Sequence, residues 1–231
     1  MAQPGGRRMY LGVAGTALLM LGGCASHRSS AEVDKEWVAR VPPGQLGDVR
    51  QAQLTEEKAR EQLTRARVAT QDAEQALEVA RRNEAAARDR QAVGELALEA
   101  AEETGDTAAI EQARTTACNA QHALTLAQAE TAWRDDAVKT LKSLEVMRQR
   151  ELDVAGAQLE QAEFKAVSAN EDVRAEDMSA GDFSSAVAEA RRKAAEQQHE
   201  VDANLQREKQ ARANYEQLRD QGYGGSGLPQ P

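Results

Sequence analysis

Residues 65–90, RARVATQDAEQALEVARRNEAAARDR, place an alanine at every seventh position and contain neither proline nor glycine. These alanines belong to a longer series of small residues at steps of seven, namely Ala52, Ala59, Ala66, Ala73, Ala80, Ala87, Gly94 and Ala101. A second register, offset by four residues, holds Leu63, Thr70, Leu77, Glu84, Gln91 and Leu98. Positions that alternate by three and four lie along one side of a helix. The pattern predicts a long helix with a narrow buried seam, whose small side chains allow a partner helix to approach closely.

Two Gly-Asp breaks, at 102–107 and 179–185, divide the rest of this Ala-, Glu- and Arg-rich chain. Each break offers a glycine suited to a helix C-terminus and then an N-cap candidate: Gly105 with Asp106 or Thr107, and Gly181 with Asp182. We therefore expect three helices, at about 48–103, 108–177 and 183–220. The predicted fold class is all-α: an elongated antiparallel coiled coil, in which a long helical hairpin carries a third helix packed on its membrane-proximal half.

The expected second helix has an apolar seam that is interrupted around Arg134–Asp136. Its first part contains Ile110, Ala113, Ala117, Ala120, Leu124 and Ala127, and its second part contains Leu141, Leu144, Leu152, Ala155, Leu159, Ala162 and Ala166. The second part also carries Val146, Met147, Val154, Phe164 and Val167, an apolar face broader than a two-helix seam requires. The third helix offers Val187, Ala190, Ala194, Val201, Leu205, Ala211, Tyr215 and Leu218 to cover that face.

The N-terminus has the layout of a secretory signal, which we assign to residues 1–23. An apolar run of 13 residues from Met9 to Leu21 is too short to span a bilayer, which takes about 20 residues. Arg7 and Arg8 precede the run, and small residues follow it. The arginine pair fits either general secretion or twin-arginine export.

The stretch Leu21-Gly22-Gly23-Cys24 resembles the lipobox of bacterial lipoproteins. The resemblance implies cleavage between Gly23 and Cys24, and a diacylglycerol thioether and palmitate-type acylation on Cys24. Acylation by three chains exceeds the two signals that stable anchoring requires. By the same resemblance, Ala25 after the cysteine favours the outer membrane. We therefore expect a lipid-anchored protein that faces the periplasm.

The segments that flank the helices are expected to lack regular structure. Residues 24–47 are predicted to be a flexible tether, since Pro42 and Pro43 are unfavourable in a helix, and residues 222–231 are predicted to be a flexible tail. Without residues 1–23 the chain has 27 basic and 38 acidic residues, a net charge of −11. This sign argues against nucleic acid as a partner.

Two residue pairs have the spacing of chemical sites. Cys118 and His122 lie one helical turn apart, but two ligands do not complete a zinc site, and a nucleophile would also need an oxyanion hole. Glu196 and His199 have the spacing of a di-iron motif, which requires a second copy and two further glutamates. We expect no catalytic residue, no metal and no cofactor, hence no enzyme. Cys118 is the remaining thiol once Cys24 is acylated, so an intermolecular disulfide between two copies is a further candidate.

The pattern of residues 65–90 resembles Ala-rich coiled-coil lipoproteins of the bacterial envelope. This resemblance implies a non-enzymatic, lipid-anchored rod that serves as a periplasmic spacer or as a docking scaffold for unidentified envelope proteins. Long antiparallel helical hairpins also resemble those of efflux adaptors and outer-membrane channel tunnels. The alternative is therefore an accessory component of a trans-envelope export or efflux assembly.

Overall fold

A computed structural model describes residues 32–222, and these residues form only helices and turns. The all-α fold is therefore confirmed for this part of the chain. The elements in order are α1 (Lys35–Val38), the 3₁₀ turn η1 (Pro43–Gln45), α2 (Gly47–Thr104), α3 (Thr107–Ala169), the 3₁₀ turn η2 (Val173–Ala175) and α4 (Ala180–Asp220). The predicted signal peptide, Cys24 and the tail after Gly222 lie outside the described residues.

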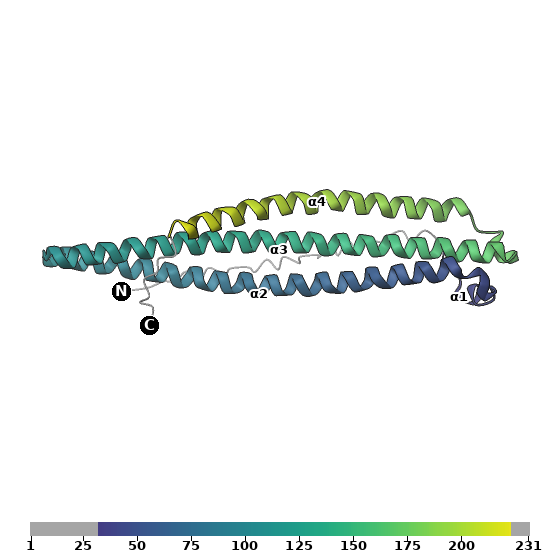
Figure 1. Ribbon diagram of the computed structural model, residues 1–231, viewed down its shortest axis with the longest axis horizontal. Coiled ribbons are helices and arrows are strands. Elements are labelled where there is room, and N and C mark those ends of the chain that lie inside the picture. The colour runs from purple at the N-terminus through teal and green to yellow at the C-terminus, as the bar shows by residue number, and fades with distance from the viewer. Residues whose placement is uncertain (1–31, 223–231) are drawn as a thin grey trace, which may run out of the picture.

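The two longest helices, α2 with 58 residues and α3 with 63, pack against each other (Figure 1). Gly105 ends α2 with a left-handed backbone (φ 71°), and the Asp106 carboxylate accepts hydrogen bonds from the first backbone N–H groups of α3. Ion pairs join Glu74 to Lys142, Arg81 to Asp135 and Arg67 to Glu145. Because one residue number rises as the other falls, α3 runs back along α2.

The buried face of α2 coincides with the seam predicted from the sequence. Every position of the two predicted registers, from Ala52 to Ala101, is buried or half-buried, as are Val49 and Glu56, which extend the series toward the start of the helix. Outside the seam, only Ala69 and Ala76 of α2 are not exposed. At Gly94, a small residue of this seam, an added Cβ atom would lie 3.2 Å from the Cα of Ala117, so the two helices come close at this layer.

Helix α4, with 41 residues, packs on the side of α3 that faces away from α2, so that α3 is the middle layer (Figure 1). Phe183 stacks on Phe164 at one end of α4, and Tyr215 stacks on Trp133 at the other. Beyond the end of α4 at Asp220, only α2 and α3 continue to the turn at Gly105 (Figure 1). We call this two-helix end the tip and the opposite end, where α3 turns into α4, the base.

The turn between α3 and α4 differs from the expectation. Helix α3 ends at Ala169 rather than near 177, and Gly181 lies inside the first turn of α4, which begins at Ala180 with Ser179 as its N-cap. Asn170 ends α3, Glu171 adopts a positive φ of 53°, and the Asp172 carboxylate accepts from the Arg174 backbone N–H. The positive φ at Glu171 and the hydrogen bond accepted by the Asp172 carboxylate therefore define this turn.

Residues 32–46 were expected in the flexible tether, and the structure corrects this. Val33 and Val41 are buried in one cluster with Phe164, Val167 and Phe183. The Asp34 carboxylate caps α1 by accepting from the Glu36 backbone N–H, and Pro43 opens η1, where its missing N–H costs nothing. The two prolines exclude a long helix but not a compact turn, and the two valines tie that turn to the base.

Candidate functional site

The Cys118–His122 pair lies on α3 near the tip. The Cys118 thiol is exposed, and its Sγ is 3.8 Å from the His122 Nε2. Within residues 32–222 no group of three or more histidine, cysteine, aspartate or glutamate side chains is placed to hold a metal ion. The Cys118–His122 pair therefore belongs to no such group within the described residues.

The Glu196–His199 pair lies on the exposed side of α4. The Glu196 carboxylate pairs with the Arg192 guanidinium at 2.5 Å, one turn earlier on the same helix. This contact is the ordinary i,i+4 ion pair of a solvated helix face. The arrangement matches a charged surface rather than a carboxylate-bridged metal centre.

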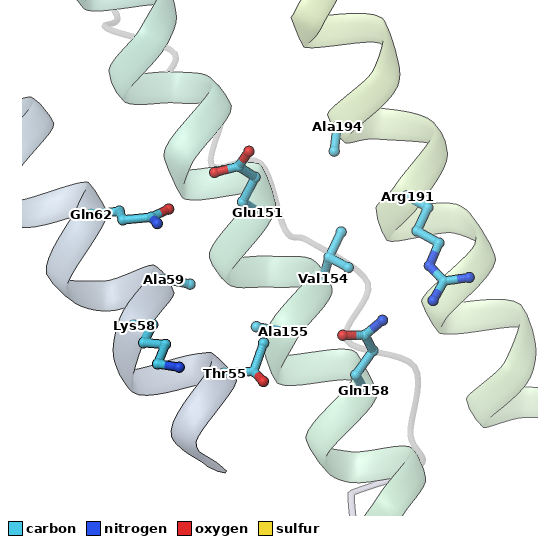
Figure 2. A pocket seen from close by; sticks show the side chains of 10 residues that line it. All are labelled: Thr55, Lys58, Ala59, Gln62, Glu151, Val154, Ala155, Gln158, Arg191 and Ala194. Carbon is cyan, nitrogen blue, oxygen red and sulfur yellow. The ribbon is translucent and has the colours of Figure 1, made fainter. Parts of the chain in front are cut away.

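An open groove of about 470 Å³ lies between α2 and α4 with α3 as its floor (Figure 2). Its floor is apolar at Val154 and Ala155, and Lys58 and Arg191 stand on its two sides. Glu151 also lines the groove and accepts a hydrogen bond from Arg148 at 2.6 Å. The sequence did not predict the groove, because its residues come from three helices far apart along the chain.

The base contains a cluster of buried apolar residues from three parts of the chain: residues 33–49, the end of α3, and η2 with the start of α4. The Phe164 and Phe183 rings stack with centroids 4.6 Å apart, and Val167 and Phe183 are almost fully buried. Glu163 is buried beside this cluster. Burial raises the pKa of its carboxyl group, Lys35 of α1 opposes that shift, and the charges of Glu160 and Glu56 add to it.

The outer surface of the base combines an aromatic ring with charged and apolar side chains. The Arg174 guanidinium lies 5.4 Å from the centre of the half-buried Trp37 ring. Hydrogen bonds from the backbone and side chain of Arg174 hold the pKa of Asp172 below its usual range, and the Arg40 charge contributes. The neighbouring Val173 is 70% exposed, more than any other large apolar residue within 32–222.

The tip has a different surface. Between residues 91 and 125 the chain has six acidic residues and one basic residue, Arg114. Glu102 and Glu103 lie in the last turn of α2, which holds no basic residue, and neither takes part in an ion pair within the described chain. Val93 and Leu96, one turn apart on the outer side of α2, are 65% and 64% exposed.

Trp133 occupies the boundary between the three-helix and two-helix parts. Its ring stacks on Tyr215 at 5.3 Å, and the Arg134 and Arg212 guanidinium groups lie 4.0 and 5.7 Å from the ring centre. Its Nε1–H is buried without a hydrogen-bond partner in the described chain. The ring therefore closes the end of the α3–α4 interface by stacking and cation–π contact.

Comparison of the chain with protein-family models, curated proteins and solved structures gave no match. Among the helices described for residues 32–222, none has both the length and the apolar content to cross a bilayer.

Proposed function

We propose that this protein is a non-enzymatic lipoprotein of the cell envelope, anchored by lipid on Cys24, in which the helical rod acts as a periplasmic spacer or docking scaffold. The observation that supports this proposal most is the shape of the described chain. Helices of 58 and 63 residues pack side by side, and at 1.5 Å per residue they extend for about 90 Å. Long helices packed side by side can span a large distance, but they do not enclose a pocket.

In this proposal α2 and α3 form an antiparallel coiled coil with a small residue at every second layer. The support is the coincidence of the buried face of α2 with a period of 3.5 residues. The third helix stiffens the half of the rod that is nearer the membrane. The base, which holds Val33 eight residues after Ala25, is then the membrane-proximal end.

The direct test is acylation of Cys24. Cells that express the wild-type chain are labelled with a palmitate analogue and compared with cells that express Cys24→Ser, and Cys118→Ser serves as the matched thiol control. We expect label on the wild type and on Cys118→Ser, and unprocessed, unlabelled precursor for Cys24→Ser. Label that persists on Cys24→Ser would refute the anchor.

The alternative function is an accessory component of a trans-envelope export or efflux assembly. The two-helix tip favours it, because a narrow end with exposed Val93 and Leu96 presents a contact surface far from the base. Site-specific photocross-linking from position 96, compared with position 54 on the same helix, tests it in intact cells. Cross-links from position 96 to a channel or adaptor protein support the assembly, and their absence favours the spacer.

A further inference from the structure

The base of the rod presents a surface in which apolar, aromatic and charged groups of both signs are mixed. Val173 is the most exposed large apolar residue within 32–222, and Pro42 and Pro43 are exposed on the neighbouring segment. Trp37 is half-buried with Arg174 against its ring. The exposed charged side chains around them include Lys35, Arg40, Glu36, Glu171, Glu176 and Asp177.

The length of chain outside the structure limits where this surface can be. Glu32, the first described residue, follows Cys24 by eight residues. Even a fully extended segment of that length spans no more than about 28 Å. If Cys24 bears the lipid, the base therefore stays within about 28 Å of the bilayer, whereas the tip is about 90 Å further along the rod.

We propose that the base rests on phospholipid headgroups and that the rod stands away from the bilayer. This inference rests on the proposed lipid anchor. Tryptophan and arginine side chains each have an apolar part and a polar end that stays hydrated. Trp37 and the adjacent Arg174 therefore suit the interface between headgroups and acyl chains. Val173 adds a small apolar contact at the same end of the rod.

The charges of the base match a zwitterionic headgroup. Arg40 and Arg174 can pair with the phosphate, while the four exposed acidic residues can pair with the ammonium group. A strongly anionic surface would repel the acidic majority. These contacts are individually weak, but the anchor holds the base at a high effective concentration next to the bilayer, so weak contacts are sufficient.

The long sides of the rod offer a poorer contact with lipid. Ion pairs such as Arg60–Glu56, Arg88–Glu84 and Lys193–Glu189 cover them. A rod lying flat would have to remove water from many of these charges, which costs more than the scattered apolar side chains return.

The two tryptophans provide the test, because Trp37 lies at the base and Trp133 lies far along α3. From Phe164 at the base to Trp133 is 31 residues of helix, about 46 Å. Lipidated protein with Trp133→Phe keeps only Trp37, and lipidated protein with Trp37→Phe keeps only Trp133. Each is reconstituted into phosphatidylcholine vesicles that contain a phospholipid with a nitroxide on its headgroup, and circular dichroism confirms that both variants fold.

We expect the nitroxide to quench Trp37 and to leave Trp133 unchanged. Val173→Asp in the Trp37-only protein should reduce the quenching, whereas Val68→Asp, at a valine on the side of α2 that is 52% exposed, should not. Quenching of both tryptophans would mean that the rod lies flat, and quenching of neither would mean that the base stands off the surface. Either result overturns the proposal.

Flotation of the same vesicles separates this proposal from the anchor itself. Protein that fails to float with the vesicles lacks the anchor, and the proposed function then fails. Protein that floats but shows no difference between Trp37 and Trp133 keeps the anchor, and only the contact at the base is then wrong.

Discussion

Gly94 of α2 and Ala117 of α3 meet so closely that a Cβ atom on Gly94 would lie 3.2 Å from the Cα of Ala117. At this layer the two backbones are separated by little more than one methyl group. The alanines at the same register along α2, such as Ala80 and Ala87, are buried by the same close approach. The stability of the rod should therefore depend on small side chains at this register.

Enlarging a small residue of this register should destabilise the rod. Ala80 is 2% exposed, and Ala80→Leu should force the helices apart and lower the free energy of unfolding by about 1–3 kcal/mol. Thermal unfolding followed by circular dichroism measures the change. Ala85→Leu is the control, because Ala85 is exposed and leucine forms helix nearly as well as alanine. Equal melting temperatures would mean that the register is not packed.

Truncating the aromatic stack should loosen the base. Phe183 is 1% exposed and stacks on Phe164, so Phe183→Ala should lower the free energy of unfolding by about 3–5 kcal/mol. Val93→Ala, at an exposed apolar position, should change it very little. Limited proteolysis provides a local readout. Cleavage within residues 170–179 should be faster in Phe183→Ala than in the wild type, since α4 should detach more readily. A stable Phe183→Ala variant would contradict the cluster.

Glu163 should make stability depend on pH in a defined direction. Its folded pKa is raised above the ordinary value of 4.5 by burial, so the folded chain keeps this proton to a higher pH than the unfolded chain does. The contribution is fully present below the unfolded pKa and is lost as pH rises through the folded pKa. Glu163→Gln should therefore raise the melting temperature at pH 7 and have little effect near pH 4.

The control for this effect is Glu57→Gln, an exposed position on α2. Glu57→Gln should shift the melting temperature equally little at both pH values. Each variant's melting temperature is compared with that of the wild type at the same pH. This difference removes the contributions of carboxylates that act in the opposite direction, such as Asp135, whose pKa is lowered by hydrogen bonding to Lys139. A Glu163→Gln effect that is independent of pH would show that burial does not disfavour its charge.

Reversing a charge at the end of α2 should stabilise the tip. Glu103 lies in the last turn, where the negative end of the helix dipole disfavours an anion, and no basic residue compensates it there. Glu103→Lys should raise the free energy of unfolding by about 0.3–1 kcal/mol at low ionic strength. The gain should shrink in high salt, and Glu57→Lys, far from a helix end, should not reproduce it.

The elongated shape is itself measurable. Small-angle scattering of the chain without residues 1–23 should give a radius of gyration well above the compact value, which is about 17 Å for a chain of this length. A value near 17 Å would mean that α4 or the tip folds back in solution.

The three long helices and the buried face of α2 could be predicted from the sequence alone, but the residues at which α3 ends and α4 begins could not. Helical periodicity is a local property: alanine and leucine at alternating spacings of three and four residues mark one side of a helix wherever its partner lies. The turn at Gly105 was also predictable, since glycine accepts a left-handed backbone and Asp106 caps the next helix.

Only the tertiary structure decided which side chains pack together at the base. Val33 and Val41 look like isolated apolar residues in a proline-containing segment, and their burial depends on Phe164 and Phe183, more than 120 residues away in the chain. The Phe164 and Phe183 rings stack across the turn between α3 and α4, a contact that no local pattern of the sequence predicts. The groove beside Lys58, Glu151 and Arg191 exists because α2 and α4 lie on opposite sides of α3. Periodicity shows which face of a helix is buried, but which distant side chains cover it depends on how the faces fit in three dimensions.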